Sequence, residues 1–347
     1  ARNDDARAVE LRLPGGRVSL AGSLATWDVF RLDPDTPSER PSGLLELRFE
    51  AGDLVPGPFH GGFLGAFAYD LGVAGERPVA AGRDPWGSPL TAGGLYVDFV
   101  VRDEERGEAW LVLGEKPGDG RSSVDERRGE IFELLERPAT NPSTRPLGRL
   151  IRTTPGEVHR DRIERTRARI AAGDFYQANL AHRFTRCVEG DPVDVYRRLR
   201  ETNPAPYAGF LAWDRETASG NEGFPTGALL SSSPELLLEF DGELARTRPI
   251  KGTAARRSSP DEDARAAREL LADPKELAEL AMIVDLERND LGRVSRPGSV
   301  RVEAFPHVES YASVHHLAAD VVAHVRPETD AIDLLAALFP GGSITGA

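Results

Sequence analysis

Residues 231–253, SSSPELLLEFDGELARTRPIKGT, and residues 273–292, DPKELAELAMIVDLERNDLG, determine how this 347-residue chain is interpreted. The first stretch is typical of strands, and the second has the apolar spacing of a helix. Lys251 ends a strand-like run, and Glu235 opens the preceding strand. Glu276 and Glu279 lie three residues apart, on one face of the predicted helix. An amine, a carboxylate and a paired acidic face indicate metal-assisted chemistry on a small anion.

Lys251 has two interpretations. A lysine that follows a strand is most often a surface charge. The residues around it, 249–253, are mostly apolar or small, however, which favours a partly buried amine. Burial lowers the pKa of a lysine amine and leaves part of it as a free nucleophile near neutral pH. Glu235 is then a candidate for exchanging protons with Lys251.

The acidic pair also has two interpretations. Residues 259–262 and 273–276 both have the cap-proline-x-glutamate pattern of a helix start. Like charges at positions 276 and 279 weaken an isolated helix by roughly 0.2–0.5 kcal/mol. A divalent cation turns this cost into binding energy, because Mg²⁺ prefers carboxylate oxygens and water. Alternatively, Glu276 closes a capping box and Glu279 is solvated.

The run YASVHHLAADVV, residues 311–322, alternates like a strand. Because successive side chains of a strand point to opposite faces, only one of His315 and His316 can face a site. The other histidines have no metal-binding spacing, and the sequence contains no HExxH, Walker A or GxSxG pattern.

The net charge of −13 argues against a nucleic-acid partner, since phosphate binding requires a basic surface. Cys187 is the single cysteine and cannot form an internal disulfide, which fits a reducing compartment. No apolar run approaches the roughly 18 residues needed to span a bilayer. The start, ARNDDARAVE, is too polar for a signal peptide. We therefore expect a cytoplasmic globular protein without a membrane partner.

The sequence pattern of the first half of the chain predicts short strands followed by a helix. Residues 95–102 and 108–114 are predicted to pair through a charged turn, and residues 121–136 form an amphipathic helix. Residues 137–149 contain three prolines and almost no apolar residues. This segment is the predicted linker between two domains.

The second half mixes helices with strands. Thr154 is predicted to cap a helix that stops at Gly173. Residues 175–186 alternate as in a half-buried strand, and a further helix opens at Asp191. Residues 207–213 and 229–232 return to strand character. The predicted fold class is α+β with antiparallel strands.

These residues resemble the chorismate-utilising enzymes, most closely those that make aminodeoxychorismate. The resemblance is strongest from about residue 157 to residue 347 and extends weakly into the first half through PFHGGFLGAFAYDLG. The matching blocks, in chain order, are GDFYQANLAHRF, NPAPYAGFL, SSSPE, TRPIKGT, DPKELAELAMIVDLERNDLGR, YASVHHL and PGGSITGA. The telling position is Lys251, because anthranilate synthases carry PIAGT where this chain has PIKGT.

The resemblance implies that chorismate and ammonia are converted to 4-amino-4-deoxychorismate, on the way to 4-aminobenzoate and folate. It implies that Lys251 attacks C2 of chorismate, that Glu235 is the general acid/base and that His316 lies beside the departing hydroxyl. It further implies Mg²⁺ bound directly by Glu279 and through water by Glu276. The residues implied to contact substrate are Gly252 and Thr253.

The resemblance also implies an architecture and a partner. The implied fold has two packed antiparallel sheets with helices outside and the site in the cleft between the sheets. Residues 1–136 are the N-terminal part of this sandwich, 137–149 the linker and 150–347 the catalytic region. A glutaminase subunit is implied as the source of ammonia.

Two departures from the family pattern affect these expectations. Relatives continue for roughly a hundred residues beyond PGGSITGA and carry further Mg²⁺ and substrate ligands there, so the catalytic region is expected to lack its C-terminal part. The first half has no LLES-type element, so tryptophan feedback is not predicted. The alternatives are a related enzyme making anthranilate or an isochorismate derivative, and a non-catalytic or degenerate subunit.

Overall fold

A computed structural model describes residues 9–13, 16–20, 31–33, 59, 61–70, 88–96, 98–113, 121–137, 144–213 and 227–346. The chain divides into two compact units, one of residues 1–141 with 211–229 and one of residues 142–210 with 230–347. Strand β8 (Arg145–Arg152) begins within the segment 137–149. The domain boundaries predicted from the sequence stay a prediction.

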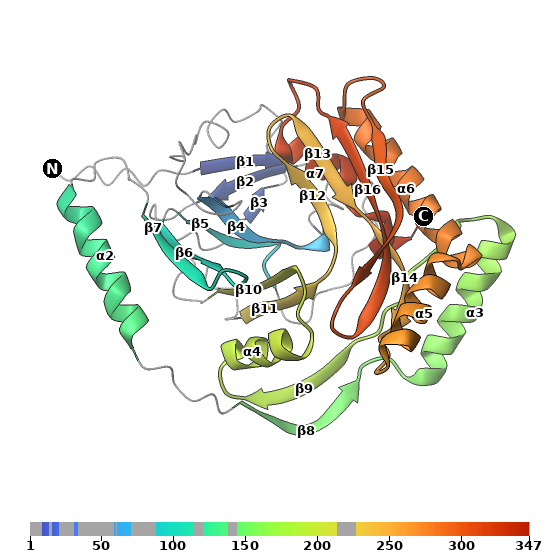
Figure 1. The fold of residues 1–347 in the computed structure, drawn as a ribbon, viewed down its shortest axis with the longest axis horizontal. Helices are drawn as coiled ribbons and strands as arrows, with labels where there is room; N and C mark the ends of the chain where they lie inside the picture. The colour runs from blue at the N-terminus through green and yellow to red at the C-terminus, as the bar shows by residue number, and fades with distance from the viewer. Residues whose placement is uncertain are drawn as a thin grey trace. The chain divides into compact units, whose positions relative to one another are not determined.

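The described residues of the first unit include antiparallel strands and helix α2 (Figure 1). Its strands are β1 (Val9–Leu13), β2 (Gly16–Leu20), β3 (Arg31–Asp33), β4 (Gly62–Phe67), β5 (Thr91–Tyr96), β6 (Asp98–Asp103) and β7 (Glu108–Leu113). Strands β6 and β7 pair from Asp98 opposite Leu113 to Asp103 opposite Glu108, which confirms the predicted hairpin. Helix α2 (Arg121–Glu136) has the predicted bounds.

The second unit opens with β8, α3 (Gly156–Ala172), β9 (Phe184–Glu189) and α4 (Pro192–Thr202). Helix α4 is capped as expected, because the Asp191 side chain accepts a hydrogen bond from the Val193 amide at 2.8 Å. The predicted Thr154 cap is wrong, since α3 begins at Gly156 with Pro155 at the cap position and no side-chain cap bond. The helix stops at Gly173 as predicted, in the left-handed conformation with φ +83°.

The strand predicted over residues 175–186 is mostly wrong, because only Phe184 onward is strand. The Asn179 amide instead donates to the Thr345 carbonyl at 3.3 Å. A long-range contact therefore takes the place of a sheet neighbour. Strands β10 (Tyr207–Trp213) and β11 (Gly227–Ser233) follow, as expected from the strand character of these two runs. The structure pairs them with each other.

A five-stranded antiparallel sheet forms the centre of the second unit (Figure 1). Its strands are β12 (Leu236–Phe240), β13 (Leu244–Arg248), β14 (Ile250–Ala255), β15 (Arg301–Ser310) and β16 (Val314–His324). Strand β16 pairs with β15, with β13 and with β14. This arrangement brings the strand that carries Lys251 beside the strand that carries His316.

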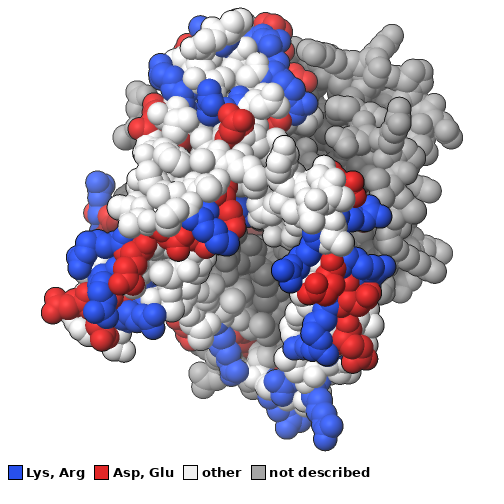
Figure 2. Space-filling model, turned by 90° about the vertical axis from the view of Figure 1, so that its right-hand side faces the viewer, with Lys and Arg blue, Asp and Glu red and all other residues white. Residues whose placement is uncertain are grey.

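Helices α5 (Pro260–Leu271), α6 (Pro274–Val294) and α7 (Ala331–Leu338) pack with this sheet to form the core. Alternate residues of β16, from Leu317 to Ala323, are fully buried in that core with Leu280 and Leu291 of α6. The α+β class with antiparallel strands is confirmed. Among the described helices, none is long and apolar enough to cross a membrane. Figure 2 shows Lys and Arg interspersed with Asp and Glu on the face turned to the viewer.

Candidate active site

Lys251 is half-buried on β14, where its backbone pairs with Leu317 of β16. Its ammonium nitrogen Nζ donates a hydrogen bond to the Ser343 carbonyl at 2.8 Å. Ser343 belongs to the one-turn helix α8 (Gly342–Thr345) and is itself buried. The amine is therefore held on the protein's backbone and does not extend freely into solvent.

Glu235 lies just before β12, and its Oε1 accepts a hydrogen bond from the Ile250 amide at 3.2 Å. The Glu235 amide in turn donates to Ser233 Oγ at 3.2 Å. The bond from Ile250 anchors the carboxylate to the backbone beside Lys251, and the bond to Ser233 holds the Glu235 backbone. Within the described part of the chain, the two side chains are not joined by an ion pair. The Glu235 carboxylate and the Lys251 amine are thus neighbours, and each is bonded to a different backbone group.

Gly252 interrupts the pairing of β14 with a register shift between Lys251 and Thr253. Its φ of +77° lies in the left-handed region, which favours glycine. A Cβ at this position would lie 3.1 Å from Glu276 Cβ and 3.2 Å from Glu276 Oε2. The glycine therefore allows an acidic side chain of α6 to lie directly against the strand of Lys251.

His316 is paired with Thr253 in the sheet. Its Nδ1 lies 3.1 Å from Thr253 Oγ1 and 3.1 Å from the Gly252 carbonyl. Because a carbonyl only accepts, the Gly252 contact requires the proton on Nδ1. Nε2 is then the ring atom that can exchange a proton with a bound molecule.

His315 points to the opposite face, as the alternation of β16 predicts. It is buried, with Nε2 3.0 Å from Asp263 Oδ1 and Nδ1 2.7 Å from Ser310 Oγ. The Arg256 side chain also bonds Asp263 and is the first cause that holds the pKa of this carboxyl below its usual range. His315 joins α5 to β15 and β16, and of the two adjacent histidines only His316 contacts Gly252 and Thr253.

Glu276 and Glu279 lie on the first turns of α6, and Lys275 Nζ contacts both. The distances are 3.1 Å to Glu276 Oε1 and 2.8 Å to Glu279 Oε1. Hydrogen bonds to Glu279 and then to Glu276 raise the pKa of Lys275. The helix cap is Asp273, whose side chain accepts from the amides of residues 275 and 276. Glu276 thus pairs with a lysine and does not serve as the cap.

The donor set fits a partial Mg²⁺ site. Two carboxylates on one helix face are the ligands that Mg²⁺ takes together with water and substrate oxygens. The close approach of Glu276 to Gly252 directs this acidic face toward the strand of Lys251. Over the residues that the structure describes, no group of three or more His, Cys, Asp or Glu side chains could hold a metal ion by itself. Any bound ion therefore needs ligands beyond Glu276 and Glu279.

Glu287 is a residue that the sequence analysis missed. It is 3% exposed on the core face of α6 and accepts a hydrogen bond from Thr247 Oγ1 at 2.8 Å. Burial first, and the charge of Glu235 to a smaller extent, raise its pKa to about 8, against the lowering effect of the Thr247 bond. Helix spacing could have indicated that Glu287 is buried, because position 287 falls on the same buried stripe as Ile283 and Leu291.

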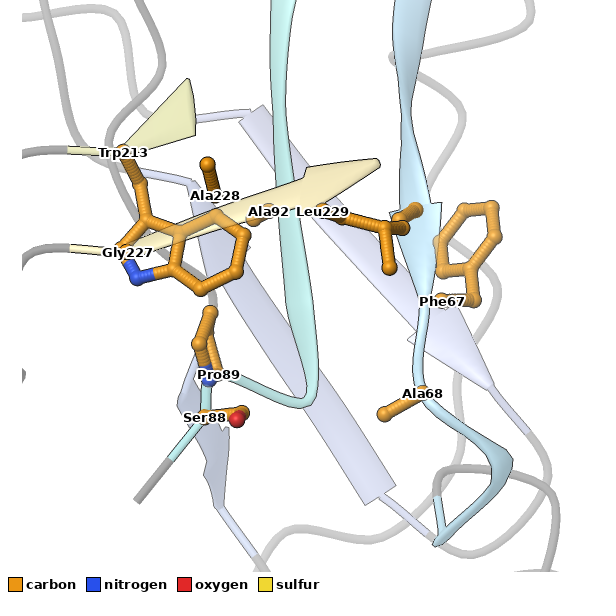
Figure 3. Close-up of a pocket in the computed structure, with 10 residues that line it drawn as sticks. Phe67, Ala68, Ser88, Pro89, Ala92, Trp213, Gly227, Ala228 and Leu229 are labelled. Atoms are coloured by element: carbon orange, nitrogen blue, oxygen red, sulfur yellow. The ribbon is translucent and has the colours of Figure 1, made fainter. Parts of the chain in front are cut away.

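A separate cavity of about 630 Å³ lies in the first unit (Figure 3). It is lined mainly by apolar side chains, with Phe67, Pro89, Trp213 and Leu229 the largest. Among the described residues that line it, none carries a carboxylate, imidazole or amine, and none is a predicted site residue. The described lining suits an apolar group, and the candidate active site is Lys251 with its neighbours.

The fold and this group of side chains define an α+β protein that presents an amine, a carboxylate, a histidine and an acidic helix face around one strand. Residues 23–347 match the model of the chorismate binding enzyme family, and the chain belongs to that family.

Individual relatives bear two names. The chain is 38% identical to anthranilate synthase component 1 of Streptomyces coelicolor, over 84% of this chain and 58% of that protein. It is 33% identical to aminodeoxychorismate synthase component 1 of Bacillus subtilis, over 96% of this chain and 72% of that protein. A solved anthranilate synthase component I from Streptococcus pneumoniae gives a TM-score of 0.73 at 27% identity, covering all of this chain and 75% of that one. The chain thus spans 58% of the length of its Streptomyces relative.

Proposed function

We propose that the chain is the chorismate-converting part of an aminodeoxychorismate synthase component 1. The observation that carries the proposal is the half-buried Lys251 amine on β14. Glu235 is anchored on the adjacent backbone, and His316 lies on the neighbouring strand. A relative of this name matches 96% of the chain, which supports the proposal.

The chemistry begins with the neutral Lys251 amine. Its lone pair forms a bond to C2 of chorismate, the two ring double bonds shift, and the bond from C4 to the hydroxyl oxygen breaks. The departing hydroxyl takes up a proton and leaves as water, and the new ammonium on C2 gives up a proton. We assign this proton exchange to Glu235, with His316 beside the hydroxyl.

Ammonia then bonds to C4, the double bonds shift back, and the bond between C2 and the lysine nitrogen breaks. Lys251 takes up the proton that the incoming nitrogen releases. The balance is chorismate plus ammonia giving 4-amino-4-deoxychorismate plus water. Gly252 and Thr253 are the expected substrate contacts, because they lie between Lys251 and His316 in the sheet.

Glu279, directly, and Glu276, through water, are the residues that we expect to hold Mg²⁺. When bound, the ion supplies positive charge that orients and neutralises a substrate carboxylate. We further propose that a glutaminase subunit delivers the ammonia. The exposed free thiol of Cys187 supports a reducing, cytoplasmic location.

Anthranilate synthesis is the second candidate, because a relative of that name is 38% identical over 84% of the chain. The test incubates the full-length protein with chorismate, Mg²⁺ and an ammonium salt, coupled to excess aminodeoxychorismate lyase. We expect 4-aminobenzoate. Anthranilate as the main product would support the second candidate, and the absence of both products would favour a non-catalytic subunit.

A further inference from the structure

The carbonyl that holds Lys251 has a second hydrogen-bond donor. Asn179 Nδ2 donates to Ser343 O at 3.1 Å, and Lys251 Nζ donates to the same oxygen at 2.8 Å. A carbonyl oxygen has two lone pairs, so it can accept both bonds at once. The amide and the amine are therefore linked through one backbone atom.

Asn179 is fixed to the α8 turn by more than this bond. Its side chain also donates to the Ile344 carbonyl, and its backbone amide donates to the Thr345 carbonyl at 3.3 Å. Gly346 packs so closely on the Gln177 carbonyl that a Cβ there would clash with it. These contacts bind the segment 177–179 to the end carbonyls of α8, which otherwise have no partner within so short a helix.

The position of Ser343 O determines where the Lys251 amine is directed. A lysine carries its nitrogen on a flexible four-carbon stem, so the nitrogen is oriented only by the groups that it bonds. One N–H held by a fixed carbonyl defines the direction of the remaining N–H bonds and of the lone pair once the amine is neutral. Displacement of an attacking atom by even about 1 Å can cost a hundredfold in rate.

We propose that Asn179 is a positioning residue for Lys251, because its amide fixes the Ser343 carbonyl that orients the reacting amine. Only the expected effect of Asn179 on turnover rests on the proposed function. The link between Asn179 and Lys251 can be measured without a substrate.

The test compares Asn179→Ala with the unaltered protein in two measurements. The first is acetylation of Lys251 by limiting acetic anhydride, read by mass spectrometry relative to Lys275, which lies on the exposed face of α6. Loss of one hydrogen bond corresponds to about a fivefold change, and we expect the Lys251/Lys275 labelling ratio to rise by that order. The second is turnover with chorismate and ammonium, where we expect kcat to fall about tenfold with KM little changed.

Thr345→Ala is the matched control, because its hydroxyl contacts the Gly341 and Gly346 carbonyls of the same turn and not Ser343 O. We expect its labelling ratio to stay at the unaltered value. Asn179→Leu, which keeps the branched shape and the number of side-chain heavy atoms without the donor, should behave like the alanine variant and serves if that variant unfolds.

An unchanged labelling ratio in folded Asn179 variants would overturn the inference, as would an equal rise in Thr345→Ala. Labelling that changes as expected in a protein making no 4-aminobenzoate would leave the link between Asn179 and Lys251 standing and reject the proposed function alone. The two failures are thereby distinguishable.

Discussion

Gly252 and Glu276 are in such close contact that a Cβ at position 252 would lie 3.1 Å from Glu276 Cβ. The two residues are far apart in the chain, yet this contact joins the strand of the candidate nucleophile to the helix of the candidate metal ligands. The contact is possible only because residue 252 has no side chain and adopts φ +77°.

Replacing Gly252 by alanine therefore has two costs. The left-handed backbone becomes strained by about 1–2 kcal/mol, and the new methyl group displaces Glu276. Gly298 is a matched control, because it has the same φ of +77° but a Cβ added there would meet nothing within 4 Å. We expect Gly252→Ala to lower the free energy of unfolding more than Gly298→Ala in urea titrations, and equal losses would contradict the contact.

Lys251→Ala should remove most aminodeoxychorismate formation while the thermal unfolding midpoint stays close to that of the unaltered protein. The reason is that the amine is the proposed nucleophile, and among the described residues its side chain bonds a single backbone carbonyl. Lys251→Arg is the control, since it keeps the positive charge but not a nucleophilic amine. Near-normal 4-aminobenzoate production by either variant at saturating ammonium would show that the covalent role is wrong.

Glu279→Gln should raise the Mg²⁺ concentration needed for half-maximal binding, because one anionic ligand is lost. Calorimetric titration of the protein with Mg²⁺ measures this directly. Glu269→Gln is the control, since Glu269 also pairs with a cation one turn away, 3.7 Å from Arg265, but belongs to α5. If both variants bind Mg²⁺ as the unaltered protein does, Glu279 is not a ligand.

Lys275→Gln should have the opposite effect on Mg²⁺ binding. The Lys275 ammonium contacts both glutamates and competes with an incoming cation for their oxygens. Because exposed ion pairs are weak, the expected gain in Mg²⁺ affinity is only about 1.5- to 5-fold. Weaker binding in the same calorimetric titration would indicate that Lys275 supports the site and does not compete for it.

Glu287 predicts a pH dependence of stability. Its pKa is raised from 4.5 in the unfolded chain to about 8 in the folded protein. The stabilisation from its bound proton is therefore complete below pH 4.5 and is lost as the pH rises through 8. At 1.36 kcal/mol per pH unit, the loss is on the order of 5 kcal/mol.

Glu287→Gln has no such proton to lose. As the pH rises from 4.5 to 8, the unaltered protein should therefore lose unfolding free energy relative to this variant. Urea titration of both proteins at several pH values measures the change. A difference that stays constant over this window would mean that Glu287 is ionised in the folded protein.

Local sequence signals predicted many elements of this fold. The charged turn between β6 and β7, the bounds of α2, and the starts of α4, α5 and α6 depend on residues a few positions apart. The same holds for His315 and His316, because the alternation of a strand alone places them on opposite faces. The order of the motif blocks along the chain likewise indicated the family without any knowledge of the tertiary contacts.

Tertiary structure decided what these signals could not. Residues 175–183 alternate like a strand, yet Asn179 bonds the α8 turn 164 positions away. Distant segments also determine three other features: the contact of Gly252 with Glu276, the two donors on Ser343 O and the burial of Glu287. Each depends on which distant backbone or side chain lies opposite, and chain spacing fixes only the neighbours within a turn or along a strand. The sequence by itself therefore determined the family and the candidate chemistry, and the packing of distant segments decided how the reacting groups are held.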